Sequence, residues 1–357
     1  MSESADIRFE RRGPLGLVTL DRPQALNALT MEMCQVFKVR LDAWSQDQDV
    51  EAVVVRGAGE RAFCAGGDIR AIWDSGHGDG VMAARFFQTE YGLNRSVFTF
   101  QKPYLALIDG VTMGGGVGVS VHGSHRIASE ATLFAMPETG IGFFPDVGGS
   151  YFLPRLAGRL GLYLGLTGAR LKAADCLNGG IATHYVGRAK HDELIERLAG
   201  ATWSRDRRAV VEDALAVVAG DPGPAPLAEH RAAIDRCFAG ASVAAIIDAL
   251  VAEEGDWAAR TLKALGRASP TSLKITFAQL HRGAALNFDG AMIMEYRMSQ
   301  ACLARHDVLE GIRAVVVDKD NAPRWDPPSL DQVSADLVEA HFAPPDGGDL
   351  SFGKVQL

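Results

Sequence analysis

The sequence lacks the features that would mark it as a metal-binding, redox or disulfide-stabilised protein. Among its 357 residues are five cysteines, which are scattered, odd in number and without a C-x-x-C pair. This pattern excludes a zinc ribbon and a disulfide framework. The nine histidines show no H-E-x-x-H or similar spacing, so we predict no metal site.

Charge and hydropathy exclude two further classes. The net charge is −8, whereas general nucleic-acid binding needs a basic face that neutralises phosphates. No apolar run reaches the roughly 18 residues of a membrane-spanning helix. The first ten residues are polar and contain no apolar signal-peptide region. We therefore expect a cytoplasmic protein that binds neither nucleic acid nor membranes.

The residues that are present predict an α/β fold. Hydrophobic residues make up 47% and charged residues 22%, as in ordinary soluble enzymes. Up to about residue 190, short strands, most of them apolar throughout, alternate with helical stretches, which indicates a mainly parallel sheet covered by helices. Beyond that point helical periodicity dominates. We expect an α/β core over residues 1–190 and a helical C-terminal region over residues 191–357 that packs on the core.

Particular segments carry this prediction. Strands are expected at 7–11, 15–20, 52–56 and 104–108, and helices at 30–47 and 81–100, with Thr30 as an N-cap. A short helix should begin in the glycine turn at 114–116 and end near Gly123. In the C-terminal region, amphipathic segments lie at 227–238, 243–253, 257–268, 272–284 and 289–304.

Two carboxylates stand out because they lie in an otherwise apolar stretch, residues 134–149 (FAMPETGIGFFPDVGG). Acidic side chains such as Glu138 and Asp146 are rarely placed in such surroundings without a partner or a chemical task. Some twenty residues upstream, residues 113–118 (MGGGVG) form a bare backbone turn that can offer N–H groups to an anion. Carboxylates combined with such a turn suit acyl chemistry, in which a carbonyl oxygen gains negative charge.

Three motifs resemble the crotonase (enoyl-CoA hydratase/isomerase) superfamily: residues 20–29 (LDRPQALNAL), 63–70 (FCAGGDIR) and 109–116 (DGVTMGGG). Further segments resemble the 3-hydroxyisobutyryl-CoA hydrolase branch of that superfamily, and the similarity extends over about residues 7–330. They are AMPE and FPDVGG within 134–149, together with 269–276 (SPTSLKIT), 295–300 (EYRMSQ) and 311–315 (GIRAV). The resemblance implies a spiral of repeated ββα units followed by a helical region.

The resemblance also implies a catalytic or binding role for each site residue. The N–H groups of Gly67 and Gly115 would form an oxyanion hole for a thioester carbonyl. Glu138 would be the nucleophile or general base, and Asp146 its partner. Glu90 would contact the substrate.

Further residues are implied in holding the coenzyme A portion. Arg22 lies where superfamily members hold it, and the backbone of Ala65 and Asp68 would meet the adenine. Coenzyme A is part of the substrate and the leaving group, so no separate cofactor and no metal are expected. Superfamily members often form trimers or pairs of trimers, so a homo-oligomer is compatible with the resemblance.

One departure separates hydrolase from hydratase. Hydratases of the superfamily carry a catalytic glutamate four residues after the first glycine of the GGG turn, where this chain has Gly118. Their second glutamate corresponds to Glu138, and Asp146 stands where they usually have glycine. The resemblance therefore implies an acyl-CoA thioester hydrolase, most specifically for 3-hydroxyisobutyryl-CoA in valine catabolism.

Three questions stay open at this point. The first alternative function is an enoyl-CoA hydratase or isomerase, and the second is a non-catalytic acyl-CoA-binding subunit. The acyl group is not fixed, since 3-hydroxypropionyl-CoA is a second plausible substrate. Attack by Glu138 itself, through a mixed anhydride, and attack by a water molecule are both compatible with the motifs.

Overall fold

The computed structural model describes residues 4–203 and 206–352, and the chain divides into two compact units that interleave in sequence. The first unit contains Met1–Gly67, Gly92–Phe134 and Arg170–Ala228, and the second contains Asp68–Tyr91, Ala135–Ala169 and Glu229–Leu357. The sequence had led us to expect a division near residue 190. The units interleave because the chain leaves the first unit twice, after Gly67 and after Phe134, before residue 190 is reached.

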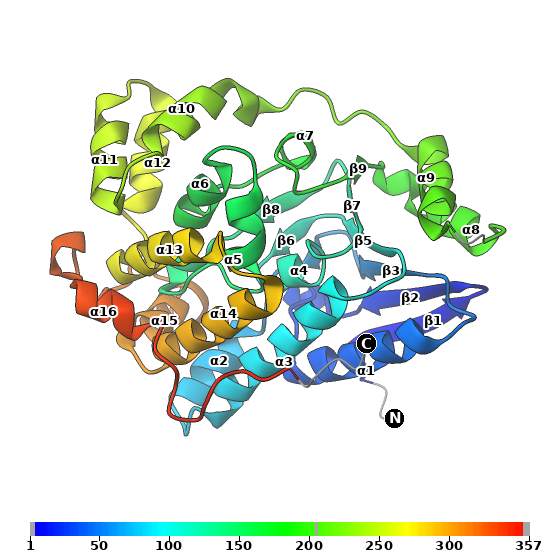
Figure 1. Cartoon of the computed structure of the whole chain (residues 1–357), viewed down its shortest axis with the longest axis horizontal. Coiled ribbons are helices and arrows are strands. Elements are labelled where there is room, and N and C mark those ends of the chain that lie inside the picture. Colours follow the sequence, from blue (N-terminus) through cyan, green and yellow to red (C-terminus); the bar gives the residue numbers. More distant parts are fainter. Residues whose placement is uncertain (1–3, 204–205, 353–357) are drawn as a thin grey trace. The chain divides into compact units, whose positions relative to one another are not determined.

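A six-stranded sheet forms the centre of the first unit (Figure 1). Its strand order is β1-β2-β3-β5-β7-β9, and only the β1–β2 hairpin is antiparallel. Every residue of β2 and β5 is buried, as their continuous apolar sequences predict. The four expected strands are confirmed as β1 (Ile7–Arg12), β2 (Leu15–Leu20), β3 (Ala52–Gly57) and β5 (Tyr104–Ile108). The sheet also contains β7 (His125–Ala128) and β9 (His184–Tyr185), which we did not predict.

A second, three-stranded sheet contains β4 (Ala62–Cys64), β6 (Val111–Met113) and β8 (Leu133–Ala135). The chain leaves β6 directly into the glycine turn and the short helix α4 (Gly115–Gly118). Our prediction that this helix would extend to about Gly123 is wrong. It ends at Gly118, and residues 119–122 continue as turns.

Helices cover the large sheet of the first unit. Helix α1 (Met31–Gln46) begins where predicted, because the Thr30 side chain accepts a hydrogen bond from the N–H of Met33. Helices α8 (His191–Ala199) and α9 (Arg207–Val218) contribute apolar side chains to one core with strands β2, β3 and β5. This core includes Leu17, Val54, Leu105, Leu194 and Leu215.

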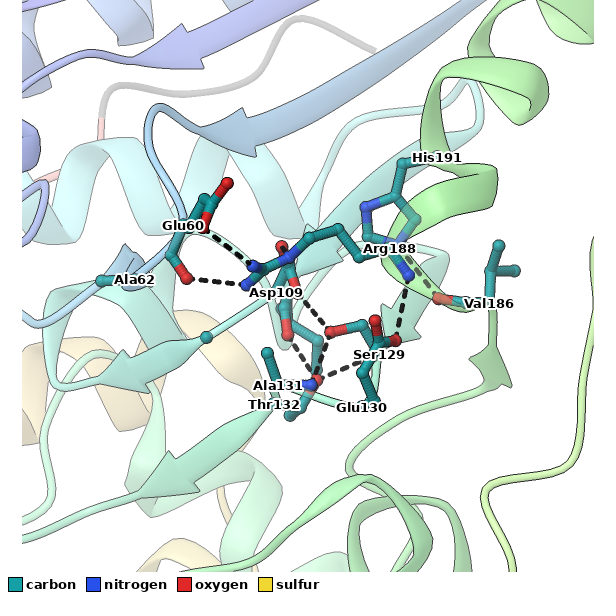
Figure 2. Close-up of polar contacts among 12 residues, drawn as sticks. Glu60, Ala62, Asp109, Ser129, Glu130, Ala131, Thr132, Val186, Arg188 and His191 are labelled. Atoms are coloured by element: carbon teal, nitrogen blue, oxygen red, sulfur yellow. Dashed lines mark hydrogen bonds and ion pairs between the residues drawn. The ribbon is translucent and has the colours of Figure 1, made fainter.

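A polar network in the first unit fixes the turn that leads into β6 (Figure 2). Arg188 Nε donates to Asp109 Oδ2 at 2.6 Å, and its Nη2 donates to the carbonyl oxygen of Glu60 at 2.7 Å. The Ser129 hydroxyl also donates to Asp109. Next to Asp109, Gly110 has a φ of +87°, and a Cβ there would lie 2.6 Å from a backbone oxygen. Arg188 and Asp109 therefore link the loops at Glu60 and Ser129 to the turn that leads into β6.

The second unit is predominantly helical, and the five predicted amphipathic segments are confirmed within a few residues. Its helices include α2 (Ile69–Gly76), α5 (Gly149–Phe152), α6 (Leu160–Thr167), α10 (Arg231–Cys237), α11 (Val243–Ala252), α12 (Asp256–Leu265), α13 (Pro270–Gly283), α14 (Phe288–Leu303), α15 (His306–Ile312) and α16 (Ala335–Ala340). Helix α3 (Val81–Phe98) begins in this unit and ends in the first.

Helices α13 and α14 both pack against the short helix α5 (Figure 1). The approach of α13 is close, since a Cβ on Gly283 would lie 2.1 Å from the Ser150 carbonyl oxygen. Among the described residues, no helix combines the length and the apolar character needed to cross a bilayer.

Candidate active site

The two glycine segments singled out in the sequence lie side by side in the first unit. Gly66 follows β4 with a φ of +126°, and a Cβ on it would lie 3.8 Å from the backbone nitrogen of Gly115. Gly116 packs against β4 so tightly that a Cβ would lie 2.1 Å from the Cys64 carbonyl oxygen. Only glycine fits such an approach of two backbones.

The backbone geometry leaves two N–H groups available at this place. Gly115 is the first residue of α4, whose opening N–H groups have no acceptor within the helix. Gly67 forms an isolated parallel bridge with Leu29, in which the Leu29 N–H donates to Gly66 O at 2.8 Å. Within residues 4–203 and 206–352, neither the Gly67 nor the Gly115 N–H donates a backbone hydrogen bond. That this pair serves as an oxyanion hole stays a prediction.

Glu138 lies in the second unit, where it opens the 3-10 helix η2 (Glu138–Ile141) just after β8. The residue is only 5% exposed, and among the described residues its Oε2 has no hydrogen-bond partner. Burial, and then the nearby charge of Asp146, raise the pKa of Glu138 well above its usual range. Such a carboxylate is a stronger base than one in water.

Asp146 is the second predicted acid, and it is also 5% exposed. Tyr91 Oη donates to its Oδ2 at 2.9 Å, and burial keeps Tyr91 protonated by raising the phenol pKa well above 10. Burial raises the pKa of Asp146 to about 7, although hydrogen bonds from Tyr91 and from the backbone act in the opposite direction. This acid can therefore change protonation state near neutral pH.

Glu90 belongs to the same group of acids and is not on a solvated helix surface. It is 2% exposed, and among the described residues its Oε1 has no partner. Burial, and then the charge of Asp146, raise its pKa well above 4.5. Phe87, on the same helix as Glu90, stacks on Phe143 at 5.2 Å between centroids, and Phe143 stacks on Phe144 at 4.4 Å. The predicted contact of Glu90 with substrate stays a prediction.

Sequence reasoning missed Glu295 of α14, which is fully buried. Its Oε2 accepts from the Gly148 N–H and its Oε1 from the Ser150 N–H, both at 2.8 Å. Burial, and then Asp146, raise its pKa to about 8. A signal was present, because Glu295 shares one helical stripe with the apolar residues Ala291, Met298 and Cys302.

The turn that carries Asp146 has an unusual backbone. The Gly149 N–H donates to Asp146 O at 2.8 Å, and the two residues between them, Val147 and Gly148, have φ values of +50° and +91°. Two successive positive φ angles define mirror-image turns, which favour asparagine and glycine. A β-branched valine in this region costs about 1–3 kcal/mol, which surrounding contacts must offset.

The buried acids Glu90, Glu138, Asp146 and Glu295 influence one another's protonation. Ionising all of them in a shared buried region is unfavourable, so near neutral pH some carry a proton while others do not. The cluster can therefore supply both a proton acceptor and a proton donor, as general acid–base chemistry requires.

The residues expected near coenzyme A form hydrogen bonds or ion pairs with other residues of the chain. Arg22 Nη1 donates to Ala28 O at 2.7 Å, and its Nε lies 3.3 Å from Asp6 Oδ2. The Ala65 N–H donates to Leu26 O at 3.0 Å, and Asp68 caps α2 by accepting from the Ala71 N–H. Their contacts with coenzyme A, and the absence of a metal requirement, stay predictions.

A family model described as enoyl-CoA hydratase/isomerase matches residues 15–342. This chain belongs to the enoyl-CoA hydratase/isomerase family. The match includes residues of both compact units.

Several curated relatives of this chain share one name. A Danio rerio protein named "3-hydroxyisobutyryl-CoA hydrolase, mitochondrial" is 47% identical over 97% of this chain and 91% of its own length. The Homo sapiens protein of the same name is 46% identical over 97% and 91%. The resemblance to that branch of the crotonase superfamily is thus confirmed. Since those proteins are named mitochondrial, a cytoplasmic location for this chain stays a prediction.

Solved structures confirm the crotonase-like α/β fold with a C-terminal helical region. One, titled as a carnitinyl-CoA dehydratase from Mycobacterium thermoresistibile, is 44% identical with a TM-score of 0.92, covering 98% of this chain and 99% of that one. Another, titled as an enoyl-CoA hydratase from Rhodobacter sphaeroides, is 38% identical with a TM-score of 0.89, covering 98% and 100%.

Proposed function

We propose that this protein hydrolyses an acyl-CoA thioester, specifically 3-hydroxyisobutyryl-CoA, to 3-hydroxyisobutyrate and coenzyme A. The observation that carries the proposal is the 47% identity, over almost the whole of both chains, to a relative named for that reaction. The buried acids agree with this proposal. The chain has Gly118 where hydratases carry one of their two glutamates, and it has a different second carboxyl, that of Asp146.

In the proposed reaction, the N–H groups of Gly67 and Gly115 hold the thioester oxygen. Negative charge develops on that oxygen as the carbonyl carbon is attacked, and each such donor stabilises the transition state by about 3–4 kcal/mol. The donors are backbone groups fixed by β4 and β6, so little reorganisation is needed when the charge appears.

Glu138 delivers the attack on the carbonyl carbon, either with its own oxygen or through a water molecule. Its unpaired Oε2 and raised pKa suit both routes. Asp146, held by Tyr91, orients the hydroxyacyl group or passes a proton to the departing thiolate. The thioester C–S bond breaks, water supplies the new oxygen, and coenzyme A leaves as the free thiol.

A second candidate is an enoyl-CoA hydratase or dehydratase, because the two similar solved structures carry such titles. Water addition across a double bond in this superfamily uses two glutamates, and the place of one is taken here by Gly118. We therefore rank hydrolysis first.

Thiol release separates these functions. We expect one free thiol per molecule of 3-hydroxyisobutyryl-CoA consumed, and neither thiol nor loss of enoyl absorbance with crotonyl-CoA. Consumption of crotonyl-CoA without thiol would support the hydratase. Binding of both esters without turnover would support a non-catalytic acyl-CoA-binding subunit.

The proposed activity also suggests a metabolic pathway and a second substrate. A hydrolase for 3-hydroxyisobutyryl-CoA would act in valine catabolism, with 3-hydroxypropionyl-CoA as a second substrate to include in the assay. A cytoplasmic location and a homo-oligomer remain part of the proposal, and oligomers are common among members of the superfamily.

A further inference from the structure

We propose that Glu295 and Gln279 are positioning residues, which hold the turn carrying Asp146 in the geometry that hydrolysis needs. They lie on α14 and α13, in the C-terminal part of the chain. The inference rests on the proposed function, because it takes Asp146 to act on the acyl group. It gives the C-terminal helices a part in the chemistry through the position of Asp146.

Glu295 holds the C-terminal side of the turn. Its two carboxylate oxygens accept from two different backbone donors, Gly148 N–H and Ser150 N–H, each at 2.8 Å. Both donors belong to the first residues after Asp146, at the start of α5, where N–H groups have no acceptor within the helix. One side chain thus fixes two points of the backbone next to the catalytic acid.

Gln279 holds the other side. Its Nε2 donates to the carbonyl oxygen of Pro145 at 2.6 Å and to Ser150 Oγ at 2.8 Å. The Pro145 carbonyl belongs to the peptide that enters Asp146. Backbone groups before and after the acid are therefore held by buried side chains more than 130 residues away in sequence.

The turn needs such external contacts because its own conformation is unfavourable. Val147 at a φ of +50° would relax toward negative φ if nothing restrained its neighbours. A change of φ at Val147 would redirect the backbone on one side of Asp146 and carry its carboxyl away from Tyr91 Oη. Glu295 and Gln279 restrain both ends of this segment.

The polar pair also contributes to stability, because both side chains are fully buried and their loss would leave polar groups of the turn without hydrogen-bond partners. Each of their hydrogen bonds given above ends on residues 145–150. Their specific contribution is therefore to fix that loop.

A double-mutant cycle tests the inference. In Glu295→Gln, one acceptor becomes an NH₂ group that faces a backbone donor. We expect kcat for thiol release to fall roughly 10- to 100-fold, as for a small displacement of a catalytic group, with KM changed less than about twofold. In an Asp146→Asn background, the same replacement should change kcat less than about twofold, because the group it positions is already lost. Gln279→Met should likewise lower kcat in the unmodified protein but not in the Asp146→Asn background. It replaces the Glu295 variant in this test if that variant fails to fold.

Asp307→Asn is the matched control. Asp307 is another buried carboxyl of the second unit, which accepts from Ser269 Oγ at 2.5 Å and from the Asp326 N–H at 2.8 Å. Its replacement should lower the melting temperature but leave kcat within about twofold. Equal losses from Glu295→Gln in both backgrounds would overturn the inference.

Amide hydrogen exchange supplies a readout that does not depend on activity. The Gly148 and Ser150 amides should exchange at least tenfold faster in Glu295→Gln than in the unmodified protein, and unchanged exchange would also overturn the inference. Absence of thiol release by the unmodified protein would instead refute the proposed function, and the exchange result would still decide the positioning.

Discussion

Replacing Glu138 with glutamine is expected to lower kcat for 3-hydroxyisobutyryl-CoA hydrolysis by about a thousandfold or more, with KM nearly unchanged. Glutamine keeps the size of the side chain but can neither attack the carbonyl carbon nor accept a proton from water. The site should still bind the ester, because the backbone donors are untouched. Steady-state thiol release measures both constants.

Glu254→Gln is the control for this variant. Glu254 is an exposed glutamate of the same unit, and the same chemical change there should leave kcat and KM unaltered. A Glu138→Gln enzyme that keeps more than about a tenth of the activity would remove Glu138 from the reaction.

The second large effect is expected for Asp146→Asn, which should lower kcat by about a hundredfold. Asparagine can still accept the hydrogen bond from Tyr91, so the turn should keep its conformation. What is lost is a group that changes protonation near neutral pH. The pH dependence of kcat should therefore lose its inflection near pH 7, and an unaltered pH profile would contradict the assignment.

The same variant should alter how folding stability depends on pH. In the native protein the pKa of Asp146 is raised to about 7, whereas an unfolded aspartate titrates near 3.9. Between these pH values the native state holds more protons than the unfolded state, so stability falls as pH rises, by about 4 kcal/mol at most. Asparagine removes this loss, and also the charge that raises the pKa values of Glu138 and Glu295.

Urea unfolding at pH 5 and pH 8 measures this difference. The free energy of unfolding of Asp146→Asn, relative to the unmodified protein, should be higher at pH 8 than at pH 5. A relative free energy that is the same at both pH values would show that the pKa of Asp146 is not raised in the native state.

The sequence was sufficient to predict the elements whose signals are local. Continuous apolar runs predicted strands β2, β3 and β5, and Thr30 predicted the start of α1. The two acids in an apolar stretch were recognised because an acidic residue among phenylalanines and glycines is unusual in any fold. Motif order then indicated the family.

Features that depend on distant residues could not be read from the sequence. Glu295 accepts a hydrogen bond from the N–H of Gly148, which lies 147 residues earlier in the sequence. In the local sequence, only its place in an apolar stripe distinguishes Glu295 from an acid on a helix surface. The left-handed conformation of Val147 contradicts its own preference and arises from tertiary contacts. The interleaving of the two units likewise depends on which segments pack together, which no local pattern records.

The most direct measurement is a crystal structure of the Glu138→Gln variant with 3-hydroxyisobutyryl-CoA bound. We predict the thioester oxygen within about 3 Å of the backbone nitrogens of both Gly67 and Gly115, with residue 138 next to the carbonyl carbon. A bound ester whose carbonyl oxygen lies beyond hydrogen-bond reach of both nitrogens, or whose acyl group lies away from residues 138 and 146, would contradict the account.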